Sequence, residues 1–523
     1  MKITKLAAAL LVTTALASCD LAPQLHIPSF SATPPYKEAA LKPEEAGSWQ
    51  QGVAAASQPR GEWWRVFNDD KLNALQDQAL KNNQDLAAMV ARVQQARATA
   101  RIAGAALLPQ IDNQTSATRR KLNPVAFGSP AGTQLPIQND IASIFTLNYE
   151  IDLFGTLRNE KKAAKQDAES QQELLQSARL ALQADVADMY FGLQSLDSEI
   201  GILERGVQIR TDSLDILKKR VTSGNITELD VSTSVVDLET TRSQLEGARQ
   251  DRASMEHALA VLLGKAPSEF DFEKSGLAAA VPVIPAGLPS GLLQRRPDIS
   301  AAQHDLAAAN ARIGIAKAAF FPRLSLTGTG GYESNTLPNV FQWSSRSWAL
   351  GPVATLPIFE GGRNVASLAR SRASYDEYVA VYRERVLESF RDVEDSLTAL
   401  KTLNLQSQSQ VVSASAAKQA EKIANLRYDS GDLGYLETIS ARRDALETER
   451  LGVQLHRAQL TATILLIRAL GGGWDAPVAE PVAVAAPVVA APVIVTAPPA
   501  EKPEDKPAEK PVMLKPLAKP LNE

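Results

Sequence analysis

Long stretches of this chain repeat apolar residues at alternating steps of three and four positions, which is the spacing of a heptad seam along a helix. The clearest stretch is residues 157–221, where one seven-residue step is interrupted by the charged side chain of Arg210. Its apolar positions are Met189, Leu193, Leu196, Ile200, Leu203, Val207, Leu214, Leu217 and Val221. A helix of these 65 residues would span roughly 97 Å. The pattern therefore predicts helices that are too long for a compact domain and must pack side by side.

A second pattern, with period two, lies between the helical stretches. In residues 141–152, mostly apolar residues alternate with mostly polar ones, as in a strand with two different faces. Residues 110–121, 324–332 and 348–358 have similar, less regular patterns. Four such strands suit a wall between lipid and water, but they cannot close a barrel alone, and open edges are not tolerated in lipid. The chain should therefore oligomerise, and three copies would give twelve strands, an even number within the range of membrane barrels. The alternative is two small soluble hairpins.

The same arrangement occurs twice along the chain. The segment Arg220–Asp230 carries a Ser-Gly pair between two long helical patterns, and it recurs 207 positions later as Arg427–Glu437. Each copy has the order helix, strand, strand, long helix, glycine-centred tip and helix, which indicates a tandem structural repeat. We assign repeat 1 to residues 72–280 and repeat 2 to residues 281–474. The predicted helices are residues 72–108, 157–221, 227–263, 291–321, 364–428 and 435–470.

The N-terminus has the features of a bacterial lipoprotein signal. Two lysines precede a short apolar run, and small residues then lead to Cys19, the only cysteine of the chain. We predict a signal peptide over residues 1–18 and a lipid-modified Cys19 at the start of an arm that spans residues 19–71. The alternative is an ordinary secretory signal with an incidental cysteine. Asp20 follows, a residue associated in enteric bacteria with retention at the inner membrane, so that final sorting depends on the rest of the chain.

Composition and motifs exclude several classes of function. The net charge of −4 gives no sign of nucleic-acid binding. The four histidines are scattered, and no zinc-protease, thiol-redox, nucleophile-elbow or phosphate-binding motif is present. We expect no enzyme activity, no metal site and no cofactor other than the covalent lipid on Cys19. Repeats of Ala, Pro and Val and then of Lys, Pro and Glu predict a disordered tail over residues 475–523.

Several features in a fixed order give this chain a resemblance to a known family. They are the lipoprotein-like cysteine, the segment Trp63–Leu72, the tandem repeat and the two Ser-Gly tips. Together they resemble the TolC-type outer-membrane efflux family, and in particular its lipidated NodT-type branch. The resemblance covers residues 19–474. It implies a mixed α and β membrane protein, a trimer whose twelve-stranded β-barrel, with four strands per chain, continues into a long periplasmic α-helical barrel.

The resemblance also implies a function and partners. The protein would be the outer-membrane exit duct of a tripartite efflux or secretion system, anchored in the outer membrane by its lipid. It would conduct small molecules passively, docked on a periplasmic adaptor that bridges to an inner-membrane pump. The alternative is a lipid-anchored periplasmic coiled-coil scaffold without channel activity, although such a scaffold has no use for paired alternating strands.

The two tips are the candidate docking sites. Glycine takes positive φ without steric cost and serine can satisfy exposed backbone groups, so each tip suits a sharp turn between helices. The resemblance implies that the tips also dock on the adaptor. The residues concerned are Ser223, Gly224, Ser430 and Gly431.

The resemblance further implies a periplasmic gate beside the tips. Tyr428 and Asp230 occupy positions that link neighbouring helix pairs in the family, and Glu437 occupies a position that can carry an acidic ring. A ring of acids in a narrow mouth would favour cations. The chain departs from part of the family at Leu433, where an arginine occurs, and at Ser440, where a second acid occurs. The alternative for the two acidic residues is a solvated helix face or a charge at a helix N-terminus.

Overall fold

The computed structural model describes most of the two repeats and part of the N-terminal arm. The described residues are 20–28, 50–51, 62–123, 125, 128, 130, 133–134, 136–222, 227–283 and 295–472. All of the described residues lie in the first unit of the chain, residues 1–476. The predicted tail, the predicted lipid site Cys19 and the first-tip residues Ser223 and Gly224 lie outside the described residues.

Long helices and one sheet make up the first unit. Its long helices are α2 (Asp70–Asn82), α3 (Gln84–Ala105), α4 (Thr156–Thr222), α5 (Glu228–Leu262), α7 (Pro297–Ala318), α8 (Arg363–Asp429) and α9 (Tyr435–Ala469). The strands of its main sheet are β2 (Gln110–Lys121), β3 (Ile137–Ile151), β5 (Arg323–Ser334) and β6 (Arg346–Thr355). Shorter elements are η3 (Trp63–Phe67), η5 (Pro267–Glu269), η6 (Leu337–Asn339), η7 (Trp343–Ser345) and the strand pair β1 (Gln50–Gln51) and β4 (Pro282–Val283).

Two of the predicted helices differ from the observed ones. The helix expected over residues 72–108 is broken at Asn83, whose backbone is extended and whose Oδ1 accepts a hydrogen bond from the Leu86 amide at 2.9 Å. Asn83 thus caps α3, and its Nδ2 also donates to the Leu262 carbonyl at the end of α5. The helix expected over residues 291–321 is interrupted at Arg296, whose backbone is extended, and α7 begins at Pro297, where proline at the first helical position loses no hydrogen bond. Residues 291–294 lie outside the described residues.

The four strands form one antiparallel sheet in the order β2-β3-β5-β6, so strands from both repeats are neighbours. The register places Phe145 of β3 opposite Gly330 of β5, and Gly330 opposite Trp348 of β6. Because side chains alternate between the faces, this register gathers the predicted apolar positions on one face. The outer edges of β2 and β6 have no partner strand in the described part of the chain.

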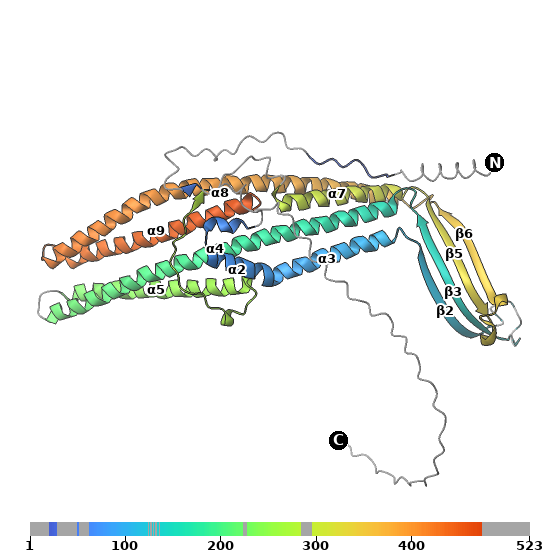
Figure 1. Cartoon of the computed structure of the whole chain (residues 1–523), viewed down its shortest axis with the longest axis horizontal. Helices are drawn as coiled ribbons and strands as arrows, with labels where there is room; N and C mark the ends of the chain where they lie inside the picture. Colours follow the sequence, from blue (N-terminus) through green and yellow to red (C-terminus); the bar gives the residue numbers. More distant parts are fainter. Residues whose placement is uncertain are drawn as a thin grey trace, which may run out of the picture. The chain divides into compact units, whose positions relative to one another are not determined.

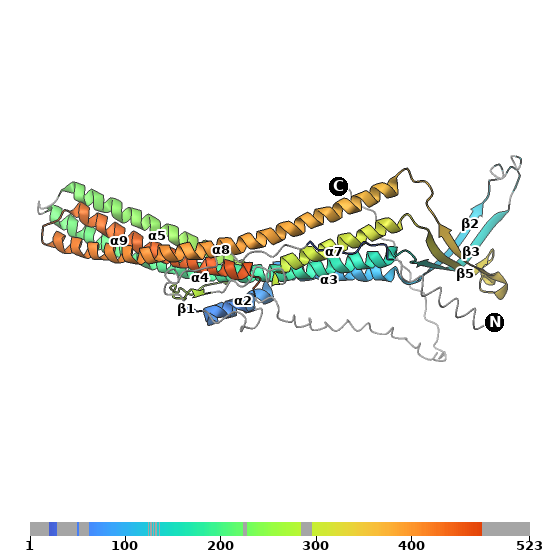
Figure 2. The ribbon, with the colours of Figure 1, turned by 90° about the horizontal axis from the view of Figure 1, so that it is seen from above.

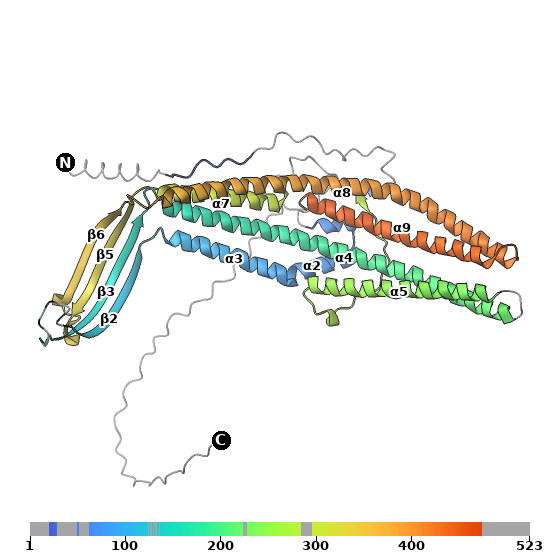
Figure 3. The ribbon, with the colours of Figure 1, turned by 180° about the vertical axis from the view of Figure 1, so that it is seen from behind.

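The helices lie side by side, with the sheet beyond one end of them (Figures 1 and 2). Helices α4 and α5 form one hairpin and α8 and α9 form another, while α3 and α7 pack along α4 toward the sheet. Seen from behind in Figure 3, α9 lies between α8 and α4, which joins the two hairpins. None of the helices among the described residues combines the length and apolarity needed to cross a membrane.

The segment before α2 inserts aromatic side chains into the largest apolar cluster of the unit. Trp63, Trp64 and Phe67 are buried, and the ring centroids of Phe67 and Phe191 lie 4.9 Å apart. The Trp63 Nε1 donates a hydrogen bond to the Gln183 Oε1 at 3.1 Å, so its polar atom is satisfied inside the core. These aromatic side chains therefore fill a surface of the helices. The segment lies within residues 19–71, the predicted N-terminal arm.

Candidate docking and gate site at the helix tips

The second tip is a left-handed helix cap. Gly431 adopts a φ of 82°, the Asp432 amide donates to the Arg427 carbonyl at 2.8 Å, and the Gly431 amide donates to the Tyr428 carbonyl at 3.1 Å. These bonds satisfy carbonyls that the helix end would otherwise leave open. No neighbouring atom lies within 4 Å of the point where a side chain on Gly431 would begin. A substitution there changes the backbone and the exterior, but no internal packing.

Ser430 completes this cap. Its hydroxyl lies 3.1 Å from both the Leu426 and the Arg427 carbonyl oxygens, to either of which it can donate. The side chain is exposed at the end of the molecule, so the turn presents polar groups outward. At the first tip, α4 ends at Thr222 and α5 begins at Glu228, at the same end of the helices (Figure 1). Both helical hairpins of the unit therefore end together.

Asp230 is bound to its own helix end. Its Oδ2 accepts hydrogen bonds from the Thr227 amide at 3.0 Å and from the Thr227 hydroxyl at 2.8 Å. A carboxylate at the third position of a helix stabilises that N-terminus through these bonds and through the helix dipole. Within the described residues, the local interpretation of Asp230 as a helix-end charge thus has direct geometric support.

Tyr428 lies between the two hairpins. The Arg220 guanidinium carbon, in the last turn of α4, lies 5.3 Å from the Tyr428 ring centroid, and the Tyr435 ring centroid lies 5.4 Å from it. The Tyr428 hydroxyl is buried and makes no hydrogen bond within the described residues. Tyr428 and Asp230 are therefore not linked in the single chain, although Tyr428 belongs to an apolar contact with Val231, the next residue of α5.

Glu437 is exposed in the first turn of α9, where a carboxylate is favoured by the helix dipole. Its side chain folds back over Gly434, so closely that a side chain on Gly434 would collide with the Glu437 carboxylate. In one chain this geometry supports a helix-end charge. A ring of such carboxylates would require further copies of the chain.

A second tyrosine, which sequence reasoning missed, joins the hairpins directly. The buried Tyr435 hydroxyl, at the start of α9, lies 3.0 Å from the Ser234 hydroxyl of α5. Burial raises the pKa of Tyr435 above its usual range, which keeps the phenol protonated and able to donate. Its ring packs with Leu217 and Ile439 in a small apolar cluster. Its position directly after the tip was the only sequence signal available.

The strongest polar link between the hairpins centres on Asp237 of α5. One carboxylate oxygen lies 2.8 Å from the Arg210 Nε of α4, and the other lies 2.6 Å from the Arg443 Nε of α9. The Arg210 and Asp237 side chains are only 5% and 6% exposed. Arg210 is the residue that interrupts the predicted heptad seam, and the buried ion pair explains that interruption.

Further polar pairs continue this junction along α9. The Arg442 Nη1 donates to the Ser213 hydroxyl at 2.7 Å, and the Arg450 Nε donates to the Glu199 carboxylate at 2.9 Å. The partners of these α9 arginines, Ser213 and Glu199, both belong to α4 of the α4–α5 hairpin. These polar contacts accompany apolar ones, since Leu446 of α9 also packs against the cluster that contains Ile200 and Leu203 of α4. Each polar bond can break without exposing a large apolar area.

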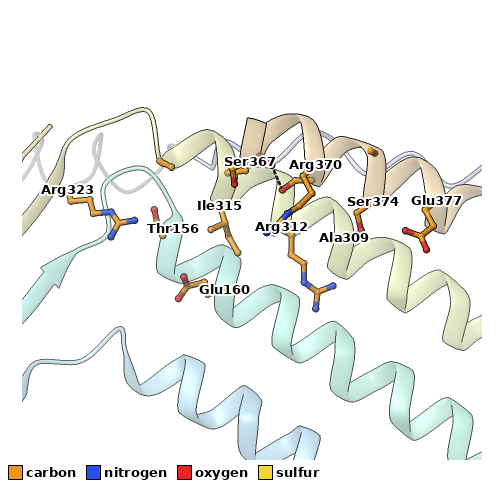
Figure 4. A pocket seen from close by; sticks show the side chains of 14 residues that line it. Thr156, Glu160, Ala309, Arg312, Ile315, Arg323, Ser367, Arg370, Ser374 and Glu377 are labelled. Atoms are coloured by element: carbon orange, nitrogen blue, oxygen red, sulfur yellow. Dashed lines mark hydrogen bonds between the residues drawn. The ribbon is translucent and has the colours of Figure 1, made fainter. Parts of the chain in front are cut away.

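A cavity of about 690 Å³ lies at the other end of the helices, between α4, α7 and α8 near the sheet. Figure 4 shows Arg312, Arg323 and Arg370 around it, together with Glu160 and Glu377. Burial, with added repulsion from Glu150, raises the pKa of Glu160 above its usual range. The mixed signs of charge give the cavity no strong preference for anions or cations. Among the described residues, no cluster of three His, Cys, Asp or Glu side chains could hold a metal ion.

Together these features define a class of protein. A sheet with one apolar face, continuous with long paired helices that end in polar turns, is the arrangement of an outer-membrane channel with a helical extension. Comparison with known proteins gives the same answer: residues 75–265 and 288–472 match the family described as outer membrane efflux protein. The chain belongs to this family.

Individual relatives agree with the family assignment. The chain is 32% identical to outer membrane protein OprJ of Pseudomonas aeruginosa, over 89% of this chain and 95% of OprJ. It is 34% identical to the toluene efflux pump outer membrane protein TtgF of Pseudomonas putida, over 90% and 97%. It is 31% identical to the cation efflux system protein CusC of Escherichia coli, over 89% and 98%.

Solved structures share the fold. The Campylobacter jejuni CmeC outer membrane channel is 27% identical, with a TM-score of 0.79 over 88% of this chain and 96% of that one. The open state of the Neisseria gonorrhoeae MtrE outer membrane channel is 26% identical, with a TM-score of 0.74 over 88% and 99%. The protein is therefore an outer-membrane exit duct of an efflux system, in a family of transport channels rather than enzymes. The alternative of a scaffold without channel activity is not supported.

Proposed function

We propose that three copies of this chain form one channel, in which twelve strands close a β-barrel in the outer membrane and the helices form an α-helical barrel in the periplasm. The main observation behind this proposal is the four-stranded sheet. One chain supplies a four-stranded sheet with an apolar face, and its two edges have no partner strand in the described residues. Unpaired edges are not tolerated in lipid, so strands of other copies must cover them.

Cross-linking between the two edges tests the assembly. Ser116 lies on the edge strand β2 and Ala349 on the edge strand β6, on the same face of the sheet by the register, and a cysteine at both positions can be joined by a flexible bis-maleimide in membranes. We expect cross-linked species of two and three chains on denaturing gels. The control replaces Ala349→Cys by Ala142→Cys in the central strand β3, directly opposite Ser116 in the register, and should link residues only within one chain. Equal chain-to-chain products from both pairs would contradict the proposal.

The lipid anchor at Cys19 is a second part of the proposal. Acyl chains contribute about 0.8 kcal/mol per buried methylene, so that several chains hold a protein firmly at a membrane. Mass spectrometry of the mature N-terminal peptide should show acylated Cys19, and Cys19→Ser should remove the modification. An unmodified mature N-terminus would exclude the anchor while leaving the channel proposal intact.

The tips would be the docking surface for a periplasmic adaptor that leads to an inner-membrane pump. Gly431→Trp adds a bulky group at the tip without an internal clash, because no atom lies within 4 Å of the starting point of that side chain. Gly362→Trp is the matched control, since Gly362 has a similar φ of 85° and equally open space but lies beside the sheet. We expect Gly431→Trp alone to abolish efflux while the trimers remain intact. Full drug resistance with Gly431→Trp would argue against docking at this tip.

The gate would lie just inside the tips and involve Tyr428, Asp230 and Glu437. In the assembled channel, the buried and unpaired Tyr428 hydroxyl could bond across helix pairs, and three copies of Glu437 would form the acidic ring. Tyr428→Phe combined with Asp230→Ala should raise single-channel conductance in planar bilayers. An unchanged conductance would exclude this pair from the gate. We propose small molecules or ions as cargo, because the names of two relatives mention toluene and cations.

A further inference from the structure

The segment of residues 20–28 is held against the helices beside the sheet. Figure 1 shows it in dark blue alongside α7 and α8. The Asp20 Oδ1 accepts a hydrogen bond from the Asn159 Nδ2 at 2.9 Å, and the other carboxylate oxygen lies 3.7 Å from the Lys162 Nζ. Asn159 itself is 1% exposed, and its amide also donates to the Gly155 carbonyl at 2.8 Å. The contact with Asp20 therefore uses a buried and oriented donor in the first turn of α4.

Two further points of attachment come from the second repeat. The Asn310 Nδ2 of α7 donates to the Pro23 carbonyl at 2.8 Å, and the Tyr375 hydroxyl of α8 donates to the His26 carbonyl at 2.8 Å. Asn310 is 3% exposed, so it is also a buried donor aimed at the segment. Helices of both repeats thus hold successive backbone groups of one extended stretch, which satisfies the polar groups on both sides.

Gly314 of α7 makes room for the same segment. A side chain begun on Gly314 would lie 2.9 Å from the Ala22 Cβ and 2.8 Å from the Asn159 Nδ2. Both distances are shorter than a carbon side chain tolerates. Because Gly314 lies within a regular helix, its lack of a side chain is explained by this close approach rather than by backbone conformation. Two buried asparagines and one glycine therefore form a surface of the helices that fits residues 20–28.

We propose that residues 20–28 are a docked strap that fixes the lipid-bearing residue at the first turn of α4, and that Asp20 is its positioning residue. This inference rests on the lipid anchor proposed at Cys19. Helix α4 begins at Thr156, directly after β3 ends at Ile151, so the strap would bring the acyl chains to the membrane at the base of the sheet. Lipid and sheet would then enter the outer membrane side by side. An undocked arm would instead leave the distance between the lipid and the sheet variable.

A nitroxide label at Gln24→Cys tests the strap in the full-length acylated protein. Gln24 is exposed, and acylation keeps Cys19 from reacting with the label. In the parent, we expect the spectrum of an immobilised label. Power-saturation measurements should give that label a single depth relative to the bilayer. Gly314→Val should make the label several times more mobile and spread its depth. Gly247→Val is the control, because nothing lies within 4 Å of a side chain at Gly247 on α5.

Variants of Asp20 test its role separately. Asp20→Ala should increase the mobility of the label, whereas Asp20→Asn should retain most of the immobilisation, since its amide oxygen still accepts from Asn159. A mobile label in the parent, or equal immobilisation in all variants, would overturn the strap. Mass spectrometry of the same samples measures acylation independently. An acylated protein with a mobile label would reject the strap alone, and an unmodified Cys19 would reject both the proposed anchor and the strap's lipid-fixing role.

Discussion

Replacement of Asp237 by alanine should destabilise the tip end of the molecule more than any other single charge removal there. The change leaves the Arg210 guanidinium, which is 5% exposed, buried without its carboxylate. Breaking a buried ion pair by removing one partner costs about 3–5 kcal/mol, because the remaining charge is uncompensated. Arg443 adds little to this cost, since its side chain is half exposed and water replaces the lost partner.

Hydrogen exchange measured by mass spectrometry suits this prediction, because the change acts on local opening within a large assembly. A loss of about 3 kcal/mol in the free energy of opening raises exchange rates on the order of 100-fold, since each 1.36 kcal/mol is a factor of ten. Peptides that contain Arg210 and Asp237 should show this rise, while peptides around the buried Trp64 should not.

Glu239→Ala on the same helix is the matched control. Glu239 forms an ion pair with Arg242 in which the two side chains are 57% and 45% exposed, respectively. Such surface pairs contribute about 0–1 kcal/mol to stability. The double variant Asp237→Leu with Arg210→Met should recover most of the protection, because apolar residues can replace a buried pair without leaving a charge. Equal exchange in Asp237→Ala and Glu239→Ala would refute the view that the buried pair stabilises this junction.

Three further changes test other features. Burial, assisted by repulsion from Glu169, raises the pKa of Glu173 to about 7, above its usual 4.5. The folded chain thus keeps a proton that the unfolded chain loses, so stability should fall by up to about 3 kcal/mol as the pH rises from about 4.5 to 7. Glu173→Gln should remove this contribution, seen as a smaller drop in melting temperature between pH 5 and pH 8 than in the parent. Tyr435→Phe should cost about 1 kcal/mol through its lost bond to Ser234, and adding Ser234→Ala should cost little more; additive losses would contradict that bond. Gly431→Ala should cost about 1–2 kcal/mol in thermal unfolding because it forces a positive φ on alanine, and an unchanged stability would show that the tip can adopt another turn.

The elements of this fold could be predicted because each has a strong local signal. The period of two in residues 141–152 and the heptad seam in residues 157–221 result from one-sided burial, which acts on every turn or strand pair. The break at Asn83 was missed because a polar residue within a helical pattern is also typical of a solvated helix face. Only the structure shows that this side chain caps α3 and reaches the Leu262 carbonyl of α5.

The candidate site was predicted less completely, for a physical reason. Turn chemistry is local, so the cap at Gly431 could be read from Ser430 and Gly431 alone. The junction between the hairpins depends on which faces of α5 and α9 meet α4, and the sequence does not contain that information. Arg210 stood out in the sequence only as a charge that interrupts the apolar seam. Its partner Asp237 could not be identified without the helix packing.

In the proposed channel, the distribution of contacts along the helices would let the tips separate while the rest of the channel stays closed. The middle of the unit is held by the apolar cluster around Trp64 and Phe191, whose disruption would expose large aromatic side chains. Toward the tips, the described residues form two smaller clusters, one around Leu203 and Leu446 and one around Leu217 and Tyr435, supplemented by hydrogen bonds and ion pairs to α9. Polar bonds exchange for bonds to water at a net cost of about 0.5–1.5 kcal/mol each, whereas buried aromatic rings have no such replacement. Separation of the two hairpins should therefore begin at the tips and stop where the aromatic cluster begins.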